Sequence, residues 1–294
     1  MTQRDTDTSE RLLLGAAVAV GAALLVAVRE LARRERRFDR TVEGRRDALR
    51  AQAPRQEDSR ETISPDEGLP APVRRYLDTA VPADTPAVEE VTIEQRGEFK
   101  LTPEGDWLPM TATQTVRTDP PGFVWDATID LRPGLGVRVV DAYVGGEGSL
   151  DARLFGAVPV ASAGPSAEMN ASELQRYLAE AVWYPNALRP GRGVEWTAID
   201  DHAARATIRD GEETASLTFH FDDADLVERV TGDRYRQEDG RTDRWVGRFD
   251  EYERRAGRLV PSDGEVGWAS ADGTQPYWRA TMTALDYRTI EGDQ

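Results

Sequence analysis

The chain of 294 residues carries 37 basic and 53 acidic side chains, a formal net charge of −16 at pH 7. It has no cysteine and only two histidines, which excludes disulfides, thiolate zinc sites, iron–sulfur clusters, cysteine nucleophiles and three-histidine metal sites. So acidic a chain repels phosphate backbones, so we expect no nucleic acid partner. We also expect no metal and no cofactor, because the sequence has none of the familiar binding signatures for them. Because the acids are spread widely and arginine replaces lysine almost everywhere, the composition favours a salt-adapted, halophilic surface over a specific basic partner.

The first predicted element is an apolar run from Leu12 to Val28, which follows a polar tail over residues 1–11. As a helix its 17 residues reach about 26 Å, against a hydrocarbon core of roughly 30 Å. A cleaved signal peptide is the alternative, but the tail is acidic and Arg29 and Glu30 follow the run directly. We therefore predict an uncleaved transmembrane helix over 12–28 whose partners are membrane lipids.

The basic residues around this run predict its orientation in the membrane. Residues 29–50 contain nine arginines, whereas only Arg4 and Arg11 precede the run. The positive-inside rule then places the C-terminal side of a single-pass protein in the cytoplasm.

Residues 29–52 are rich in helix formers and charges but have few apolar positions, which predicts a charged, solvated helical stalk. Residues 53–68 are polar and predict a flexible linker. The folded domain is expected to cover residues 69–290.

Alternation of apolar and polar residues dominates this domain. After a short helix that opens at Pro72 and ends before Pro82, the periodicity changes to two, as in Phe123 to Leu131. A second helix is expected to begin with a capping box of Asn170 and Glu173 and to end before Pro185. The predicted strands cover 88–99, 107–118, 122–131, 136–145, 148–158, 194–199, 203–209, 214–222, 226–236, 243–254, 258–269 and 276–288.

These elements predict a mainly β (α+β) fold. So many strands in one sheet need curvature to hide their edges. We therefore expect a large curved antiparallel sheet, or half-barrel, of about 11–12 strands with short helices on its concave face, joined to the N-terminal transmembrane helix.

Six sequence blocks occur in this order: LPAPVRRYL, PPGFVWDATI, VVDAYVGGEGSLDARLFG, ELQRYLAEAVWYP, DGEETASLTFHF and WVGRFDEYERRAGRLVPSDGEVGW. Together they resemble an uncharacterised prokaryotic family of single-pass proteins that share a domain of unknown function. The resemblance covers about residues 66–290 and implies no known activity. In its order of helices and strands the chain is also similar, at the level of the fold alone, to LolA- and LppX-like lipoprotein carriers, which hold an apolar ligand between sheet and helices.

The sequence lacks familiar catalytic signatures, and its best polar cluster lies on the predicted strands and helix. Asp126 and Asp141 interrupt apolar strands, Arg153 lies on the next strand, and Arg176 and Glu180 lie one helical turn apart. If the helix packs on these strands, the carboxylates Asp126, Asp141 and Glu180 could act as acid and base, and the arginines could bind a polar head group. A buried, charge-paired network that only fixes the helix to the sheet is the favoured interpretation.

Large aromatic side chains are the other candidate binding feature. Trp125, Tyr177 and Trp183 could line an apolar groove, although such residues more often form core. We rank three functions in this order: a non-enzymatic module that binds a lipid or other apolar ligand, an interaction or scaffold domain without ligand, and a hydrolase or lyase that uses the Asp/Glu cluster.

Overall fold

The computed structural model describes residues 3–54, 68–82, 85–191, 193–236, 240–271 and 273–289, with side chains from residue 25 onward. In this part of the chain the helices are α1 (Gln3–Arg50), α2 (Ala71–Ala80), α3 (Ala167–Glu180) and the 3-10 helices η1 (Ala181–Trp183) and η2 (Pro185–Leu188). The strands are β1 (Val88–Phe99), β2 (Leu108–Arg117), β3 (Gly122–Arg132), β4 (Leu135–Val144), β5 (Glu147–Leu154), β6 (Val158–Ala163), β7 (Val194–Asp200), β8 (Ala203–Asp210), β9 (Glu213–Phe221), β10 (Val227–Arg236), β11 (Arg241–Arg255), β12 (Arg258–Ser270) and β13 (Gly273–Thr289).

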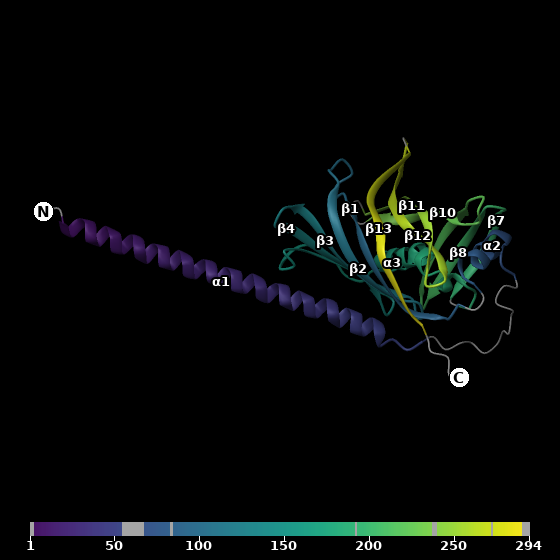
Figure 1. The fold of residues 1–294 in the computed structure, drawn as a ribbon, viewed down its shortest axis with the longest axis horizontal. Helices are drawn as coiled ribbons and strands as arrows, with labels where there is room; N and C mark the ends of the chain where they lie inside the picture. Colours follow the sequence, from purple (N-terminus) through teal and green to yellow (C-terminus); the bar gives the residue numbers. More distant parts are fainter. Residues whose placement is uncertain are drawn as a thin grey trace.

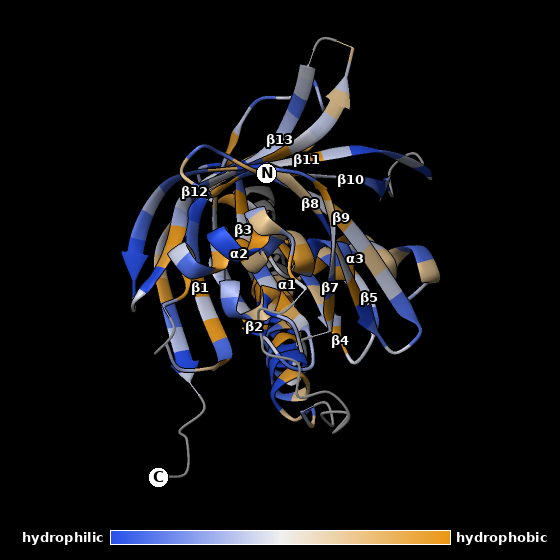
Figure 2. Ribbon diagram, turned by 90° about the vertical axis from the view of Figure 1, so that its right-hand side faces the viewer, coloured by the Kyte–Doolittle hydropathy of each residue, from blue (hydrophilic) through white to orange (hydrophobic). Residues whose placement is uncertain are grey.

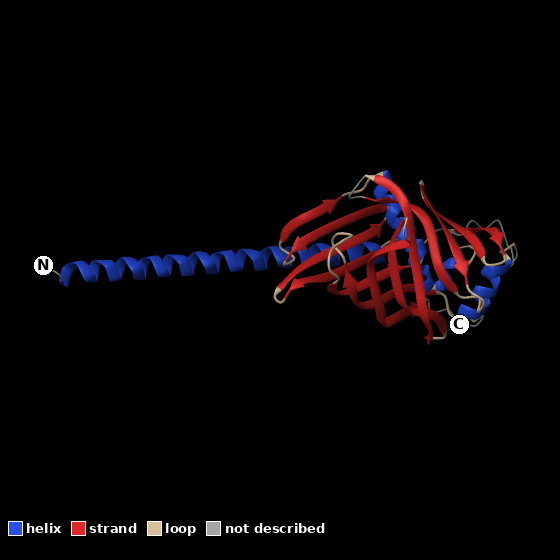
Figure 3. Ribbon diagram, turned by 90° about the horizontal axis from the view of Figure 1, so that it is seen from above, coloured by secondary structure: helices blue, strands red, loops and turns tan. Residues whose placement is uncertain are grey.

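All these strands belong to one antiparallel sheet in the order β6-β5-β4-β3-β2-β1-β13-β12-β11-β10-β9-β8-β7. Strands that follow each other in the chain pair with each other, except for β6 and β7, which form the two edges, and the pair of β1 with β13 joins the two halves. The sheet curls around the short helices (Figures 1, 2 and 3). The predicted mainly β, antiparallel and curved architecture is confirmed.

The number of strands differs from the prediction by one. Residues 148–158 were expected to form a single strand, but the chain turns at Phe155 and Gly156 and continues as β6. Most side chains of β6 are exposed because it is an edge strand, so it has no alternating pattern from which it could have been found.

Helix α3 begins earlier than its predicted capping box. Ser166 is the N-cap, and its Oγ accepts a hydrogen bond from the Met169 amide at 3.1 Å. The Asn170 side chain instead accepts from the Gly148 amide at 2.8 Å and donates to Glu213 at 3.0 Å. The capping box predicted at Asn170 and Glu173 is therefore wrong, because Asn170 joins α3 to β5 and β9 rather than capping the helix.

Helix α3 occupies the concave side between the two edges of the sheet. An added Cβ at Gly148 on β5 would lie 2.7 Å from the Met169 carbonyl oxygen, so only glycine allows this close approach. On the other side, the Gln175 amide donates to the carbonyls of Ser216 and Asp233, both at 3.1 Å, where β9 and β10 are no longer paired. The helix thus replaces missing sheet hydrogen bonds and positions one of its faces toward β3, β4 and β10.

The main core lies between the concave face and the helices. Phe123, Ala127 and Ile129 on β3 are buried, as their alternation predicted. Helix α2 adds Tyr76, whose ring centroid lies 5.8 Å from that of Phe221. Burial of apolar area from both layers is the main stabilising term of such a fold.

The C-terminal half of α1 packs on the outer face of the sheet. Phe38, Val42 and Leu49 are each 0% exposed and pack against Val124 and Val140. The expectation of a solvated stalk is therefore wrong for this half: three apolar residues, too sparse for a coiled coil, are enough to cover two strands. The first residues of α1 whose side chains are described, such as Leu25, Val26 and Val28, are exposed, and the helix there extends away from the sheet (Figure 1).

Charged contacts accompany this packing. Asp126 lies on the outer face, where it accepts from Arg138 at 2.8 Å and from Arg46 of α1 at 3.1 Å. Arg138 also pairs with Asp39 of α1. The network is partly buried, so it fixes the helix in one position more than it adds stability.

The predicted transmembrane run and linker fall largely outside the described part. The side chains of residues 12–24 and the whole of residues 55–67 lie outside it. Among the described residues, no helix combines the length and the apolar character that crossing a bilayer requires. Membrane insertion therefore stays a prediction.

Replacing Phe38 with alanine should release the docked half of α1. The ring is fully buried, and the Arg138 and Arg153 guanidiniums lie over it at 5.2 and 4.4 Å. Truncation therefore removes about 3–5 kcal/mol of packing energy, which is enough for the helix to leave the sheet instead of retaining a cavity. Limited trypsin digestion should then cleave after Arg40 and Arg45 faster than in the wild type. Leu31→Ala, on the same helix but 38% exposed, is the control; equal digestion of both variants would contradict the docking.

Candidate functional site

A cavity of about 500 Å³ lies between α3 and the inner face of the sheet. Strands from both halves of the sheet contribute to it, because α3 packs on β5, β9 and β10 but stands away from β1 and β11 to β13. Its aromatic lining consists of Phe99, Trp125, Trp183, Tyr235, Trp245, Phe249, Trp268, Tyr277 and Trp278.

The aromatic side chains form a connected wall. Trp183 contacts Phe249 and Trp278, with ring centroids 5.6 and 6.4 Å away. Trp268 stacks on Tyr277 at 6.0 Å, and the hydroxyl of Tyr277 accepts from Trp245 Nε1 at 3.0 Å. Rings held in this way give a preformed apolar surface whose shape changes little on binding.

The mouth of the cavity lies at the tips of two hairpins. The β1–β2 connection contributes Leu101, Thr102 and Pro103, and β13 contributes Gln275 and Pro276. Leu101 is 53% exposed. A ligand could therefore enter from solvent past an apolar rim.

A charged cluster closes the opposite, α3 side of the cavity. Arg176 donates to Asp141 and to Glu180, both at 2.8 Å, and its guanidinium lies 4.8 Å from the Trp125 ring centroid. The second oxygen of Glu180 accepts from Gln114. Arg176, Asp141 and Glu180 are 15%, 14% and 14% exposed, so these ion pairs are shielded from water.

Glu173 extends the cluster by one helical turn. It is 5% exposed and accepts from Arg234 of β10 at 3.4 Å, while Arg234 also donates to Ser172 at 2.9 Å and lies over the Trp245 ring. The buried polar atoms on the cavity lining that have no hydrogen-bond partner include Asp141 Oδ1, Glu173 Oε2 and Trp183 Nε1. Buried polar atoms are nearly always paired, so these three mark the place where a ligand would supply partners.

Burial controls the titration of this cluster. Burial raises the pKa of Glu173 to about 7, although Arg234 opposes the shift. Burial also raises the pKa of Asp141 despite Arg176. For Arg176, burial would lower the pKa, but Glu180 and Asp141 together hold it above its usual value. Desolvation thus outweighs the favourable effect of the arginines on the pKa of both carboxyl groups.

The structure brings five of the predicted site residues to this cavity. Asp141, Glu180 and Arg176 form the cluster, and Trp125 and Trp183 lie on the aromatic wall. Whether they bind a ligand stays a prediction.

Three other candidates lie elsewhere. Asp126 is on the opposite face of β3 with Arg138 and Arg46, and Arg153 pairs with Asp151 at 2.8 Å under α1. Both therefore fail to join the cluster, because alternate residues of a strand point to opposite faces. Tyr177 is buried in the core, where its hydroxyl donates to the Thr118 carbonyl.

Sequence reasoning missed Glu173 and Arg234. Glu173 was assigned to a capping box, although its spacing from Arg176 and Glu180 places all three on one helix face. Arg234 follows Val230 and Gly232 on the inward positions of β10. A charged residue at an inward strand position is unusual, and this pattern could have identified Arg234 from the sequence.

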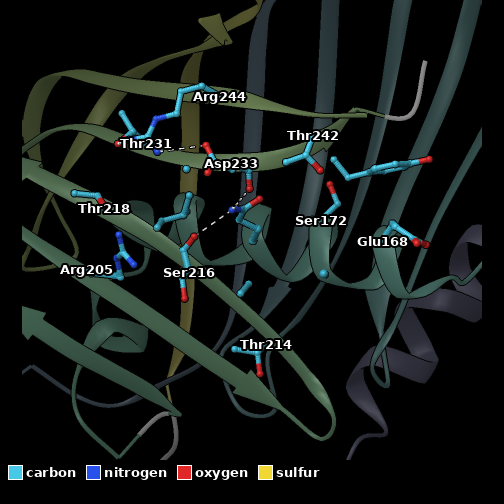
Figure 4. Close-up of a pocket in the computed structure, with 16 residues that line it drawn as sticks. Glu168, Ser172, Arg205, Thr214, Ser216, Thr218, Thr231, Asp233, Thr242 and Arg244 are labelled. Carbon is cyan, nitrogen blue, oxygen red and sulfur yellow. Dashed lines mark hydrogen bonds and ion pairs between the residues drawn. The ribbon is translucent and has the colours of Figure 1, made fainter. Parts of the chain in front are cut away.

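A second hollow lies where β9 and β10 separate and is of a different kind. This groove of about 510 Å³ is lined mainly by hydroxyl and charged side chains such as Ser216, Thr218, Thr231, Arg205 and Arg244 (Figure 4). Its polar lining is unsuited to an apolar ligand. Among the described residues, no three His, Asp or Glu side chains lie together so that they could hold a metal ion.

Comparisons with known proteins agree with the resemblance noted in the sequence. Residues 67–287 match the model of DUF6920, a family of unknown function, and the chain belongs to this family. No match was found among curated proteins.

Two solved structures are similar to this chain over much of its length. A DUF1329 family protein from Desulfovibrio piger has 15% identity, covers 76% of this chain and 96% of its own, and has a TM-score of 0.40. A LolA superfamily protein from Nitrosomonas europaea has 10% identity, with 74% and 93% covered and a TM-score of 0.34. Likeness at this level carries no functional argument, so the functional proposal rests on the residues of this chain.

Proposed function

We propose that this DUF6920 chain is a non-enzymatic module that binds a lipid or another apolar ligand in the cavity beneath α3. The observation that carries the proposal is the cavity itself: about 500 Å³, an aromatic wall and a few convergent polar groups, which is the usual composition of a small-molecule site. A hollow of this size lined by tryptophan would be costly to keep as unfilled core.

We further propose that residues 12–28 anchor the chain in the membrane, with the β domain in the cytoplasm. The direction of α1 supports this arrangement. Arg50, at the end of α1, pairs with Glu90 at the start of β1. Asp39, about three turns earlier in α1, pairs with Arg138, which lies closer to the β1–β2 connection. The N-terminal half of α1 therefore points toward the end of the sheet that carries this connection. Ten residues, or about 15 Å of helix, separate Val28 from docked Phe38. The cavity mouth would then open on the bilayer side.

An enzymatic role is the second candidate. The pKa of Glu173, raised to about 7 by burial, is a value suited to a general acid or base, and Asp141 lies in the same cluster. The ion pairs of Arg176 with Asp141 and Glu180 favour a fixed, structural cluster instead, so we place binding first.

To test the proposal, the whole chain is recovered from the membrane fraction after an alkaline carbonate wash. It is then placed in lipid nanodiscs. Dodecanol brominated at its chain end should quench the fluorescence of the cavity tryptophans, because heavy atoms quench only at contact. Native mass spectrometry should also detect a bound amphiphile. Absence of both signals would remove the proposal.

A matched pair of mouth variants makes the test specific. Leu101→Glu places a charge on the rim and should weaken quenching severalfold, since a charge opposes entry of an apolar chain. Ile199→Glu, at an equally exposed apolar position on β7 outside the cavity lining, should leave quenching unchanged. Equal effects of the two variants would mean that the probe binds elsewhere.

A further inference from the structure

The charged cluster has two acceptor atoms without donors, whereas the unpaired Trp183 Nε1 is a donor on the aromatic wall. Asp141 Oδ1 and Glu173 Oε2 are buried carboxylate oxygens with no hydrogen-bond partner, and both residues line the cavity. Glu173 is 5% exposed, so water has little access to this group from outside. A buried, unpaired carboxylate oxygen is unfavourable unless a bound group supplies a donor.

The charges around Glu173 leave the same gap. The cluster holds three carboxyl groups, Asp141 of β4 with Glu173 and Glu180 of α3, against two guanidinium groups, Arg176 of α3 and Arg234 of β10. Two further cations line the cavity outside this cluster: Arg236, which pairs with Asp243 at 3.6 Å, and Lys100 directly after β1, whose Nζ lies 5.0 Å from the Trp107 ring centroid. Within the cluster itself, three carboxyl groups face two guanidinium groups when all are ionised, and burial raises the pKa of Glu173 and of Asp141 despite the arginines.

The arginines are already committed to other partners. Arg176 binds Asp141 and Glu180 on two sides, and Arg234 donates to Ser172. An anionic head group would have to compete with these carboxylates and would add to the excess negative charge. A cationic head group would meet free acceptors and cancel that excess.

Building on the proposed function, we infer that the cavity binds an amphiphile with a primary ammonium head group, which donates hydrogen bonds to Asp141 and Glu173 while its chain lies along the tryptophan wall. The ammonium supplies the donors and the positive charge that the cluster lacks. The wall accepts the hydrocarbon chain without requiring a specific length.

Three probes with one chain and different head groups test this inference on the full-length chain in nanodiscs. Dodecylamine, dodecanoate and dodecanol, each brominated at the chain end, are compared by tryptophan quenching. At about pH 8 the amine is still protonated and Glu173 is ionised, so dodecylamine should bind about tenfold or more tighter than dodecanoate, with dodecanol between them. Equal affinities, or a preference for dodecanoate, would overturn the inference while the proposed function stands; if no probe binds, the proposed function itself fails.

Two further readouts locate the head group. Glu173→Gln should reduce the preference for dodecylamine severalfold, whereas Asp151→Asn, which removes the same charge from an ion pair on the outer face, should leave it intact. In the wild type the preference should grow as pH rises from about 6 to about 8, because Glu173 loses its proton in this range. A preference that does not change with pH would contradict the assignment even if the Glu173 variant fails to fold.

Discussion

Replacing Arg176 with methionine is expected to lower the free energy of unfolding by about 3–5 kcal/mol at neutral pH. Methionine keeps most of the stem that packs on Trp125 and Phe123 but removes the guanidinium. The carboxylates of Asp141 and Glu180 then stay buried, but they have lost the guanidinium with which both of them pair. Breaking a buried ion pair from one side costs more than the pair contributes, because the remaining charge stays desolvated.

This loss should shrink as the pH falls toward about 5. Removing Arg176 takes away an interaction that lowers the pKa of Asp141, so Asp141 gains a proton more easily in the folded variant than in the wild type. A protonated carboxyl group is cheaper to bury than a carboxylate. Urea unfolding at several pH values measures both the loss and its decrease.

Arg153→Met is the matched control for Arg176→Met. Arg153 also pairs with a carboxylate at 2.8 Å, but it compensates one carboxylate rather than two and is 25% exposed against 15% for Arg176, so its loss should cost less, about 1–2 kcal/mol. Similar losses in both variants, or a loss at Arg176 that does not depend on pH, would mean that the interior cluster is no more shielded than the outer one.

Much of this arrangement could be predicted from alternation alone. The alternation in β3 predicts its inward positions correctly, and the register of β3 with β4 places Trp125 opposite Asp141. The same alternation separates Asp126 from Trp125. The pattern therefore predicts that Asp126 lies on the opposite face from Asp141, as the structure shows.

Other features depend on contacts that a local pattern does not encode. Phe38, Val42 and Leu49 are too sparse to predict burial, because the surface that covers them comes from β3 and β4, more than 70 residues later. The role of Glu173 likewise depends on Arg234, which another element supplies. The salt-adapted surface and the cytoplasmic side of the membrane stay predictions, since neither is a property of the fold.

Glu173 should make the wild type less stable as pH rises, and Glu173→Gln should remove this effect. In the unfolded chain the carboxyl group has its ordinary pKa of about 4.5, while burial raises the pKa to about 7 in the folded protein. Folding therefore binds a proton between these two values, and the stability that is fully present below about pH 4.5 is lost progressively up to about pH 7. The difference corresponds to about 3 kcal/mol.

Glutamine keeps an oxygen that can accept from Arg234 but carries no charge to bury. We therefore expect Glu173→Gln and the wild type to unfold with nearly equal free energies at about pH 5, and the variant to be more stable by up to about 3 kcal/mol at about pH 8. Asp141 titrates in both proteins, so its contribution cancels from the difference. Urea unfolding across this range is the measurement, with Asp151→Asn as a control that should show no such gain. A Glu173 variant that is less stable than the wild type at every pH would mean that the ionised carboxylate, through Arg234, holds α3 to β10, and that the cluster is balanced without any ligand.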